Sequence, residues 1–143
     1  MNKDKLSLNI FDEYEDDSII ADEAYRIASR LKIYITRNKS LFAYISNGEQ
    51  VLAALFLPET LEDCFSFDVV VAPEAQRQGL GARLVDSAIK EYEYRKSIED
   101  EMGNEEYEYC IEVVNENMKK LLEKKGFHVY DEDFKTGAWM MRK

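Results

Sequence analysis

The chain has 143 residues, of which 45% are hydrophobic and 34% charged, and its formal net charge is −10 at pH 7. This length fits one domain, residues 1–143, that can bury its own core, and the composition excludes an intrinsically disordered chain. The acidic excess disfavours nucleic acid and anionic membranes as partners and favours a cationic substrate.

Three sequence features predict where the protein is found. No run approaches the roughly 20 apolar residues of a membrane span, and residues 1–5 lack the apolar core of a signal peptide. The two cysteines, Cys64 and Cys110, lie far apart within apolar stretches. We interpret them as reduced, buried thiols and not as a disulfide, and we expect a cytoplasmic protein.

The first third of the chain predicts a strand followed by a helix. Residues 6–10 alternate between apolar and polar side chains, as a half-buried strand does. From residue 20 onward, apolar residues recur at helical spacing, and either Asp17 or Ser18 can cap this helix. The β-branched segment 32–36 fits either a short strand or a second helical piece.

A hairpin and a strand with three consecutive valines are predicted next. Residues 41–46 and 50–57 are apolar runs that flank an Asn-Gly pair, the strongest short-range signal of a β-hairpin. Residues 65–71 form the valine strand. Because this strand is apolar on both faces, we expect it to lie in the centre of the sheet.

The second half of the chain predicts two helices and three strands. Residues 80–102 carry an apolar stripe at helical spacing, and residues 109–114 form a strand. A last helix carries two lysines in its final turn and ends at Gly126. Two further strands are predicted at residues 127–130 and 138–141. The order β–α–β–β–β–α–β–α–β–β predicts the α/β class, with a mixed sheet and helices on its faces.

A glycine-containing loop between the valine strand and the long helix predicts an anion site. The strand ends at Pro73, a polar stretch follows, and Gly79 and Gly81 lie at the start of the helix. Several backbone N–H groups then point in one direction, aided by the helix dipole, which suits a phosphate. Gly79 can take a positive φ, and Gly81 lets the backbone approach the anion with no Cβ in the way.

Motifs in this loop and in the last helix together resemble those of a known family. The run from Gln76 to Ala82 fits the pattern Gln/Arg-x-x-Gly-x-Gly/Ala, and a lysine-rich helix ends at a Gly-Phe pair. Over residues 41–127 the chain closely resembles the GNAT superfamily of N-acetyltransferases. The resemblance implies a mixed, mostly antiparallel sheet with a splay between two parallel strands, the valine strand and strand 109–114, and helices on both faces.

The resemblance also implies where acetyl-CoA binds. The valine strand would bond the pantetheine arm through its backbone, the loop would hold the pyrophosphate through its N–H groups, and Arg77 or Arg83 would add charge. The asparagine that caps the last helix is Asn115 when counted back from the Gly-Phe pair, and Asn117 when counted from the preceding strand. The implied cofactor residues are Val69, Val70, Val71, Gln76, Arg77, Gln78, Gly79, Leu80, Gly81, Ala82, Asn115 and Asn117.

Acetyl transfer to an amine needs a base for the amine and a donor for the thioester oxygen. The resemblance places the oxygen donor on the backbone of the valine strand. For the base we choose Glu112 first and Asp68 second. The alternative for Glu112 is a structural carboxylate paired with a basic or hydroxyl group.

The chain departs from the family at the acid that protonates the leaving thiolate. The position that usually holds a tyrosine, counted from the Gly-Phe pair, holds Leu122, which cannot donate a proton. Tyr92, Tyr109 and Tyr130 are the nearest substitutes in the pattern, and we interpret each as a packing residue.

We therefore expect an N-acetyltransferase that moves acetyl from acetyl-CoA to a primary amine by direct attack in a ternary complex, with no metal. The acceptor is a cationic small molecule or a protein amine, and loops near residues 11–40 and 131–137 shape its site. The alternative is a non-catalytic CoA-binding or protein-interaction module on the same fold, which the missing tyrosine favours. Neither nucleic acid nor a membrane is expected as a partner, and a homodimer stays open.

Overall fold

The computed structural model describes residues 5–12, 18–59, 64–103 and 110–143. The chain divides into two compact units, and each is described by itself. The first unit contains residues 1–59 and 67–90, and the second contains residues 60–66 and 91–143. Residues 104–109 lie outside the described residues. They include Asn104, where we expected the long helix to stop, and residue 109, where we expected the next strand to begin.

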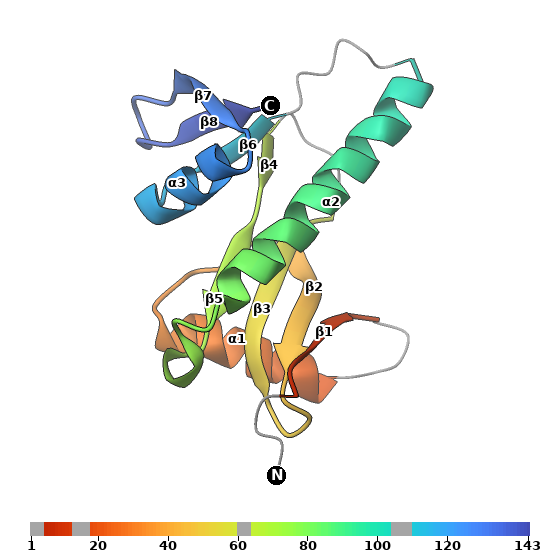
Figure 1. The fold of residues 1–143 in the computed structure, drawn as a ribbon, viewed down its shortest axis with the longest axis vertical. Helices are drawn as coiled ribbons and strands as arrows, with labels where there is room; N and C mark the ends of the chain where they lie inside the picture. Colours follow the sequence, from red (N-terminus) through yellow and green to blue (C-terminus); the bar gives the residue numbers. More distant parts are fainter. Residues whose placement is uncertain (1–4, 13–17, 60–63, 104–109) are drawn as a thin grey trace. The chain divides into compact units, whose positions relative to one another are not determined.

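The first unit is built on an antiparallel sheet with the strand order β1-β2-β3-β5 (Figure 1). The expected hairpin is confirmed, because β2 and β3 pair on either side of the Asn-Gly turn. Asn47 Oδ1 accepts hydrogen bonds from the backbone N–H groups of Glu49 and Gln50, both at 2.9 Å. The strands are β1 (Ser7–Ile10), β2 (Lys39–Ser46), β3 (Val51–Pro58) and β5 (Asp68–Val71).

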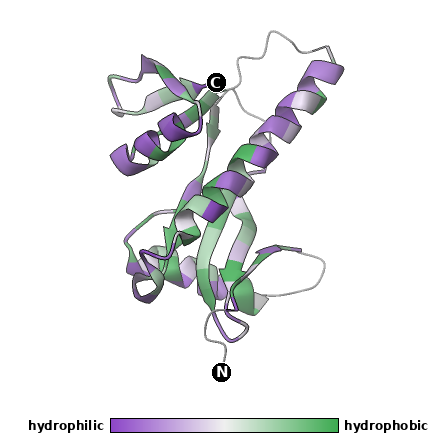
Figure 2. Cartoon of the chain, viewed as in Figure 1, coloured by the Kyte–Doolittle hydropathy of each residue, from purple (hydrophilic) through white to green (hydrophobic). Residues whose placement is uncertain are grey.

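Two helices contribute to the core of this unit. Helix α1 (Ser18–Arg30) packs against β3 and β5 through an apolar stripe that includes Ala24 and Ile27. The first turns of α2 (Leu80–Glu101) belong to the same unit, and Figure 1 shows them in front of the sheet with α1 behind it. Green covers much of these strands in Figure 2, and purple covers much of the C-terminal end of α2.

The segment 32–36, for which the sequence left strand and helix open, forms neither. Helix α1 ends in a left-handed residue, Lys32, whose φ is 58°. The N–H of Ile33 then bonds back to the carbonyl of Ala28 at 2.9 Å, as in a Schellman motif. The chain leaves α1 through a defined turn and continues without regular structure to β2.

The predicted valine strand is two strands in the structure. β4 (Cys64–Ser66) pairs with β6 in the second unit, and β5 pairs with β3 in the first. The expected central position is therefore wrong for this sheet, in which β5 is the last strand. Because the chain changes sheet at Phe67, only one edge of β5 is paired with another strand in the described residues. β3, whose residues are all buried, takes the interior place.

The second unit contains a mixed sheet with the strand order β4-β6-β8-β7. β4 and β6 are parallel and the other pairs are antiparallel. Its remaining elements are β6 (Cys110–Val113), α3 (Glu116–Lys124), β7 (His128–Glu132) and β8 (Trp139–Arg142). In the described residues β6 pairs with β4 and β8 and not with β5.

The expectation of reduced thiols is wrong in this structure. Cys110 is disulfide-bonded, and the described residues contain no free cysteine. Cys64, the other cysteine of the chain, is the backbone partner of Cys110 in the parallel β4–β6 pair. Neighbouring strands lie about 4.8 Å apart, which is within the Cα separations of about 4.4–6.8 Å that disulfides need. Because the two cysteines lie far apart in the sequence, no local pattern indicates that β4 and β6 bring them together.

Candidate active site

The outer edge of β5 presents backbone groups that no strand uses in the described residues. The N–H of Ala72 bonds the carbonyl of Leu52 at 2.8 Å, so alternate residues of β5 bond β3. The backbone N–H and C=O groups of Val70 therefore face β3, while those of Val69 and Val71 face outward. An extended molecule with amide groups can bond such an edge as an added strand. The backbone polar groups of Val70 are used within the sheet, and its part in cofactor binding stays a prediction.

A strained loop follows this edge and leads into α2. The 3-10 turn Pro73–Ala75 comes first, and then Arg77 and Gly79 both take left-handed conformations, with φ of 69° and 75°. The positive φ expected for Gly79 is confirmed. Alternation of left-handed residues with others can turn successive N–H groups to one side, an arrangement that suits an anion, and we call residues 76–81 the nest. The nest lies at the N-terminus of a 22-residue helix, where the dipole also favours an anion.

Gly81 lies where the first turn of α2 packs on β5. A Cβ at this position would lie 3.7 Å from Val71 Cγ2 and 3.9 Å from Val69 Cγ1. Those are ordinary van der Waals contacts, so the small residue lets α2 pack closely on β5. The Cβ would point toward the strand and not toward the loop. An alanine would fit at this position, and the role of Gly81 in phosphate binding stays a prediction.

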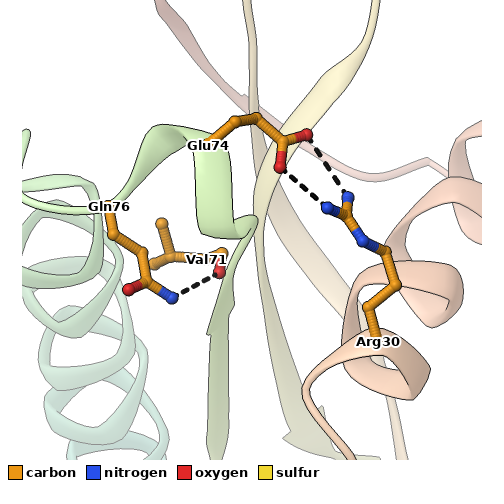
Figure 3. A network of polar contacts seen from close by, with 4 residues as sticks. All are labelled: Arg30, Val71, Glu74 and Gln76. Atoms are coloured by element: carbon orange, nitrogen blue, oxygen red, sulfur yellow. Dashed lines mark hydrogen bonds and ion pairs between the residues drawn. The ribbon is translucent and has the colours of Figure 1, made fainter.

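Polar contacts on both sides hold the turn before the loop (Figure 3). Arg30, at the end of α1, forms a two-pronged ion pair with Glu74, with Nη2–Oε2 at 2.9 Å and Nη1–Oε1 at 3.3 Å. This hydrogen bonding lowers the pKa of Glu74 and raises the pKa of Arg30. Gln76 Nε2 donates to the outward carbonyl of Val71 at 3.4 Å. No local sequence pattern marks the Arg30–Glu74 pair, whose members lie 44 residues apart.

Asp68, the second candidate for the base, is part of an ion pair. Its Oδ2 lies 3.0 Å from Nζ of Lys39, whose side chain is 9% exposed. Asp68 is the cross-strand partner of Phe56, whose ring packs on Tyr25 of α1. The carboxylate therefore lies on the α1 face of the sheet, opposite the face that Gly81 covers. No local sequence pattern identifies Lys39 as the ion-pair partner of Asp68.

Glu112, the first candidate for the base, lies in β6 opposite Met140. Its side chain is half-buried between buried neighbours on the strand. Its carboxylate has no hydrogen-bond or ion-pair partner among the residues that the structure describes. The alternative of a paired structural carboxylate therefore finds no support in that part of the chain, and the assignment of Glu112 as base stays a prediction.

The start of α3 decides between the two asparagines. Asn115 is the N-cap residue, and its Oδ1 accepts a hydrogen bond from the N–H of Met118 at 3.1 Å. Asn117 lies inside the first turn. The count from the Gly-Phe pair is therefore the correct one, and it assigns the tyrosine position to Leu122. Leu122 is 0% exposed, so this position belongs to the core.

Two of the three substitute tyrosines are packing residues, as expected. The ring of Tyr92 lies 5.7 Å from that of Phe65 and 6.1 Å from that of Phe127, both edge-on. Burial, with smaller contributions from Tyr130 and Glu93, raises the pKa of Tyr92 to about 12. The Arg142 guanidinium lies 4.3 Å from the ring centre of Tyr130. Tyr109 lies outside the described residues.

The hairpin between β7 and β8 surrounds an acidic pocket. The pocket has a volume of about 410 Å³ and lies within the segment expected to shape the acceptor site. Phe134 at its rim is 94% exposed. The pocket is lined by Asp131, Glu132, Asp133, Phe134, Lys135 and Met140.

The described ranges contain neither a cluster of metal ligands nor a helix that could span a membrane. No three His, Cys, Asp or Glu residues there gather as metal ligands would. None of the helices that the structure describes combines the length and the apolar character that crossing a bilayer requires.

The chain is similar in fold to several solved acetyltransferases. The ribosomal-protein-S18-alanine N-acetyltransferase from Escherichia coli has 18% identity and a TM-score of 0.53, covering 95% of this chain and 91% of that one. Ard1 from Thermoplasma volcanium has 15% identity and a TM-score of 0.56, covering 95% of both chains. A GNAT family acetyltransferase from Elizabethkingia anophelis with acetyl-CoA bound has 16% identity and a TM-score of 0.53, covering 97% of both.

A comparison with curated protein sequences gave no match. The family model of the acetyltransferase (GNAT) domain matches residues 37–129, which include β2, β3, β5, the nest and α3. Because this match covers well over half of the chain, it shows the family. The chain therefore belongs to the GNAT acetyltransferase family.

Proposed function

We propose that this protein moves the acetyl group of acetyl-CoA to the primary amine of a cationic acceptor, by direct attack within a ternary complex. One observation carries the cofactor half of the proposal: a strand edge that pairs with no other strand in the described residues runs directly into the nest at a helix N-terminus. The edge suits the amides of a pantetheine arm, and the nest suits a pyrophosphate. We further propose that residues 1–143 act as one acetyltransferase domain.

The cofactor roles follow from this geometry. Val69 and Val71 bond the pantetheine amides through their outward backbone groups. The N–H groups of the loop, from Gln76 to Gly81 and Ala82, bind the pyrophosphate, with Asn115 fixing the start of α3. Arg77 and Arg83 are exposed on the loop and the first turn of α2, where a positive charge adds to phosphate binding. Bound acetyl-CoA supplies the activated acetyl group.

The base is the first catalytic role to assign. An amine attacks only when it is neutral, so a carboxylate must take its proton directly or through water. Glu112 carries this role in our proposal, because its carboxylate has no partner within the described residues. Asp68 is the second choice, since its pairing with Lys39 already engages one of its oxygens.

The acceptor is a cation in this proposal. The pocket between β7 and β8 presents three carboxylates beside an exposed phenylalanine ring. Carboxylates attract a protonated amine, and an aromatic face adds a cation–π contribution. The net charge of −10 points the same way. Cationic small molecules and protein amines both have this chemistry.

A cytoplasmic site of action remains part of the proposal. The disulfide of Cys110 bears on it directly, because disulfides are rare in the reducing cytoplasm. The state of this cysteine in the isolated protein therefore tests the location as well as the fold.

A non-catalytic CoA-binding module is the second candidate. One observation favours it: Leu122 is fully buried at the position where the family resemblance implies a tyrosine, so no proton can come from that position to the leaving thiolate. The acetyltransferase would acetylate an amine, whereas the non-catalytic module would bind CoA without turnover.

The test is release of CoA thiol from acetyl-CoA in the presence of an amine panel, which includes spermidine, lysine and a lysine-containing peptide. Turnover with a cationic member and none with a neutral amine of similar size supports the proposal. Tight binding of acetyl-CoA without turnover on any amine identifies the non-catalytic module.

A further inference from the structure

We propose that the ion pair between Arg30 and Glu74 is a positioning element that holds the cofactor loop in its anion-binding form. This inference rests on the proposed function, because it assigns the pair a role in binding CoA. Neither residue touches the cofactor in this account. They act through the backbone of the turn that precedes Gln76.

Arg30 is held at a fixed place by the way in which α1 ends. It is the last residue of the helix, two positions before the left-handed Lys32. The bond from Ile33 N–H to the Ala28 carbonyl closes the end of the helix, so the chain around Arg30 has a defined backbone. The guanidinium then meets both oxygens of one carboxylate, a geometry that fixes direction as well as distance.

Glu74 is held from the other side by the 3-10 turn. Pro73 fixes φ at the start of this turn, Ala75 is 2% exposed, and the N–H of Ala75 bonds the carbonyl of Ala72 at 2.9 Å. A two-pronged contact to Glu74 therefore ties the whole turn to α1. The next two residues, Gln76 and Arg77, begin the nest.

The loop beyond the turn needs such support because part of it is strained. Arg77 takes a left-handed conformation with φ of 69°, which residues other than glycine avoid. Strained backbone of this kind persists only where its surroundings fix it, and it gathers at binding sites. Two contacts in the structure fix it on its N-terminal side: the Arg30–Glu74 pair and the bond from Gln76 to Val71 (Figure 3).

The pair is a poor candidate for a purely stabilising role. The side chains of Arg30 and Glu74 are 47% and 49% exposed, and exposed ion pairs add little to the free energy of unfolding. A carboxylate two residues before a phosphate loop also repels the anion that the loop binds. Its presence there is explained if the position of the turn matters more than the charge.

This contrast gives an experiment in which charge and position predict opposite signs. CoA is titrated calorimetrically into wild type, Glu74→Gln, Arg30→Gln and the double variant at one salt concentration. If the pair positions the loop, each single variant weakens CoA binding about fivefold and the double variant is no worse than either single variant. If only charge matters, Glu74→Gln binds CoA more tightly and Arg30→Gln more weakly.

Two controls separate a local effect from loss of stability. Glu93 forms an ion pair of similar length with Lys143 in the second unit, at 3.0 Å and with 52–53% exposure. Glu93→Gln should leave CoA affinity unchanged. The swapped variant, Arg30→Glu with Glu74→Arg, keeps the net charge and should recover part of the affinity. Thermal unfolding of all variants should stay within about 3 °C of wild type.

The outcomes are distinguishable from failure of the proposed function. If wild type does not bind CoA, the cofactor assignment is wrong. If wild type binds CoA and Glu74→Gln binds it equally or more tightly, the positioning role is overturned while the cofactor site stands.

Discussion

Lys39 Nζ lies 3.0 Å from Asp68 Oδ2, and the lysine side chain is 9% exposed. The pair joins β2 to β5 over the intervening strand β3, on the face that α1 covers. It lies at the end of β5 away from the nest, since Asp68 is the first residue of the strand. The contact therefore fixes the strand whose edge we assign to acetyl-CoA.

Removing one member of this pair should destabilise the fold. Lys39→Met leaves the carboxylate of Asp68 partly buried without its cation, and we expect a loss of about 2 kcal/mol in the free energy of unfolding. Urea denaturation measures this loss. Lys143→Met, which breaks an exposed pair, is the control and should change stability by less than about 0.5 kcal/mol. If the two variants lost the same free energy of unfolding, the Lys39–Asp68 pair would not stabilise the fold more than an exposed pair does.

The two loop glycines should respond differently to alanine. Gly79 has a φ of 75°, so Gly79→Ala should cost about 1 kcal/mol in backbone strain and weaken CoA binding. At Gly81 a Cβ would meet Val71 and Val69 at ordinary contact distances, so Gly81→Ala should keep both stability and affinity. Urea denaturation and CoA titration check both variants, and the reverse order of effects would refute the nest.

Glu112→Gln should slow acetyl transfer while leaving acetyl-CoA affinity unchanged. General-base catalysis contributes at least about a hundredfold, so turnover at pH 7 should fall by about that factor. The measurement is the pH profile of turnover on an amine from the panel, with Glu116→Gln as the control on an exposed carboxylate. A variant with the full rate across the pH range would mean that another group takes the proton.

Tyr92 should contribute to stability in a way that depends on alkaline pH. Burial raises its pKa in the folded protein from 10 to about 12. A raised pKa means that the folded state favours the protonated phenol, so this contribution is complete below pH 10 and is lost as the pH rises through about 12. The stability of Tyr92→Phe should fall less steeply over this range, and its turnover should equal that of wild type. Loss of turnover would instead identify Tyr92 as the missing acid.

The disulfide of Cys110 should be detectable in the isolated protein. We expect no reaction with iodoacetamide in denaturant until a reducing agent is added, followed by modification of both cysteines. Closing the loop between Cys64 and Cys110 should stabilise the fold by about 4 kcal/mol, so reduction should lower the melting temperature. Ready alkylation without reduction would contradict the bond and restore the interpretation as free thiols.

Local sequence signals predicted the parts of this fold that depend on local chemistry. The Asn-Gly pair placed the β2–β3 hairpin, the helical spacing of Ala24 and Ile27 placed α1, and the glycines placed the loop before α2. Positive φ at Gly79 was likewise predictable, because few other residues adopt it readily. The count from the Gly-Phe pair also found the correct helix cap, Asn115.

The remaining features depend on which segments meet in three dimensions. The valine run suggested a buried central strand, yet the chain changes sheet at Phe67 and leaves β5 as an edge strand. The two ion pairs, Arg30–Glu74 and Lys39–Asp68, join residues 44 and 29 positions apart. No local pattern marks such contacts, and the pairing of β4 with β6 that aligns the cysteines is equally non-local.

Calorimetric titration of the protein with acetyl-CoA tests the central claim most directly. The account predicts one site with micromolar affinity, which Gly79→Ala weakens and Gly81→Ala does not. Absence of binding to the wild-type protein would contradict the account, because the edge of β5 and the nest before α2 would then have a structural role alone.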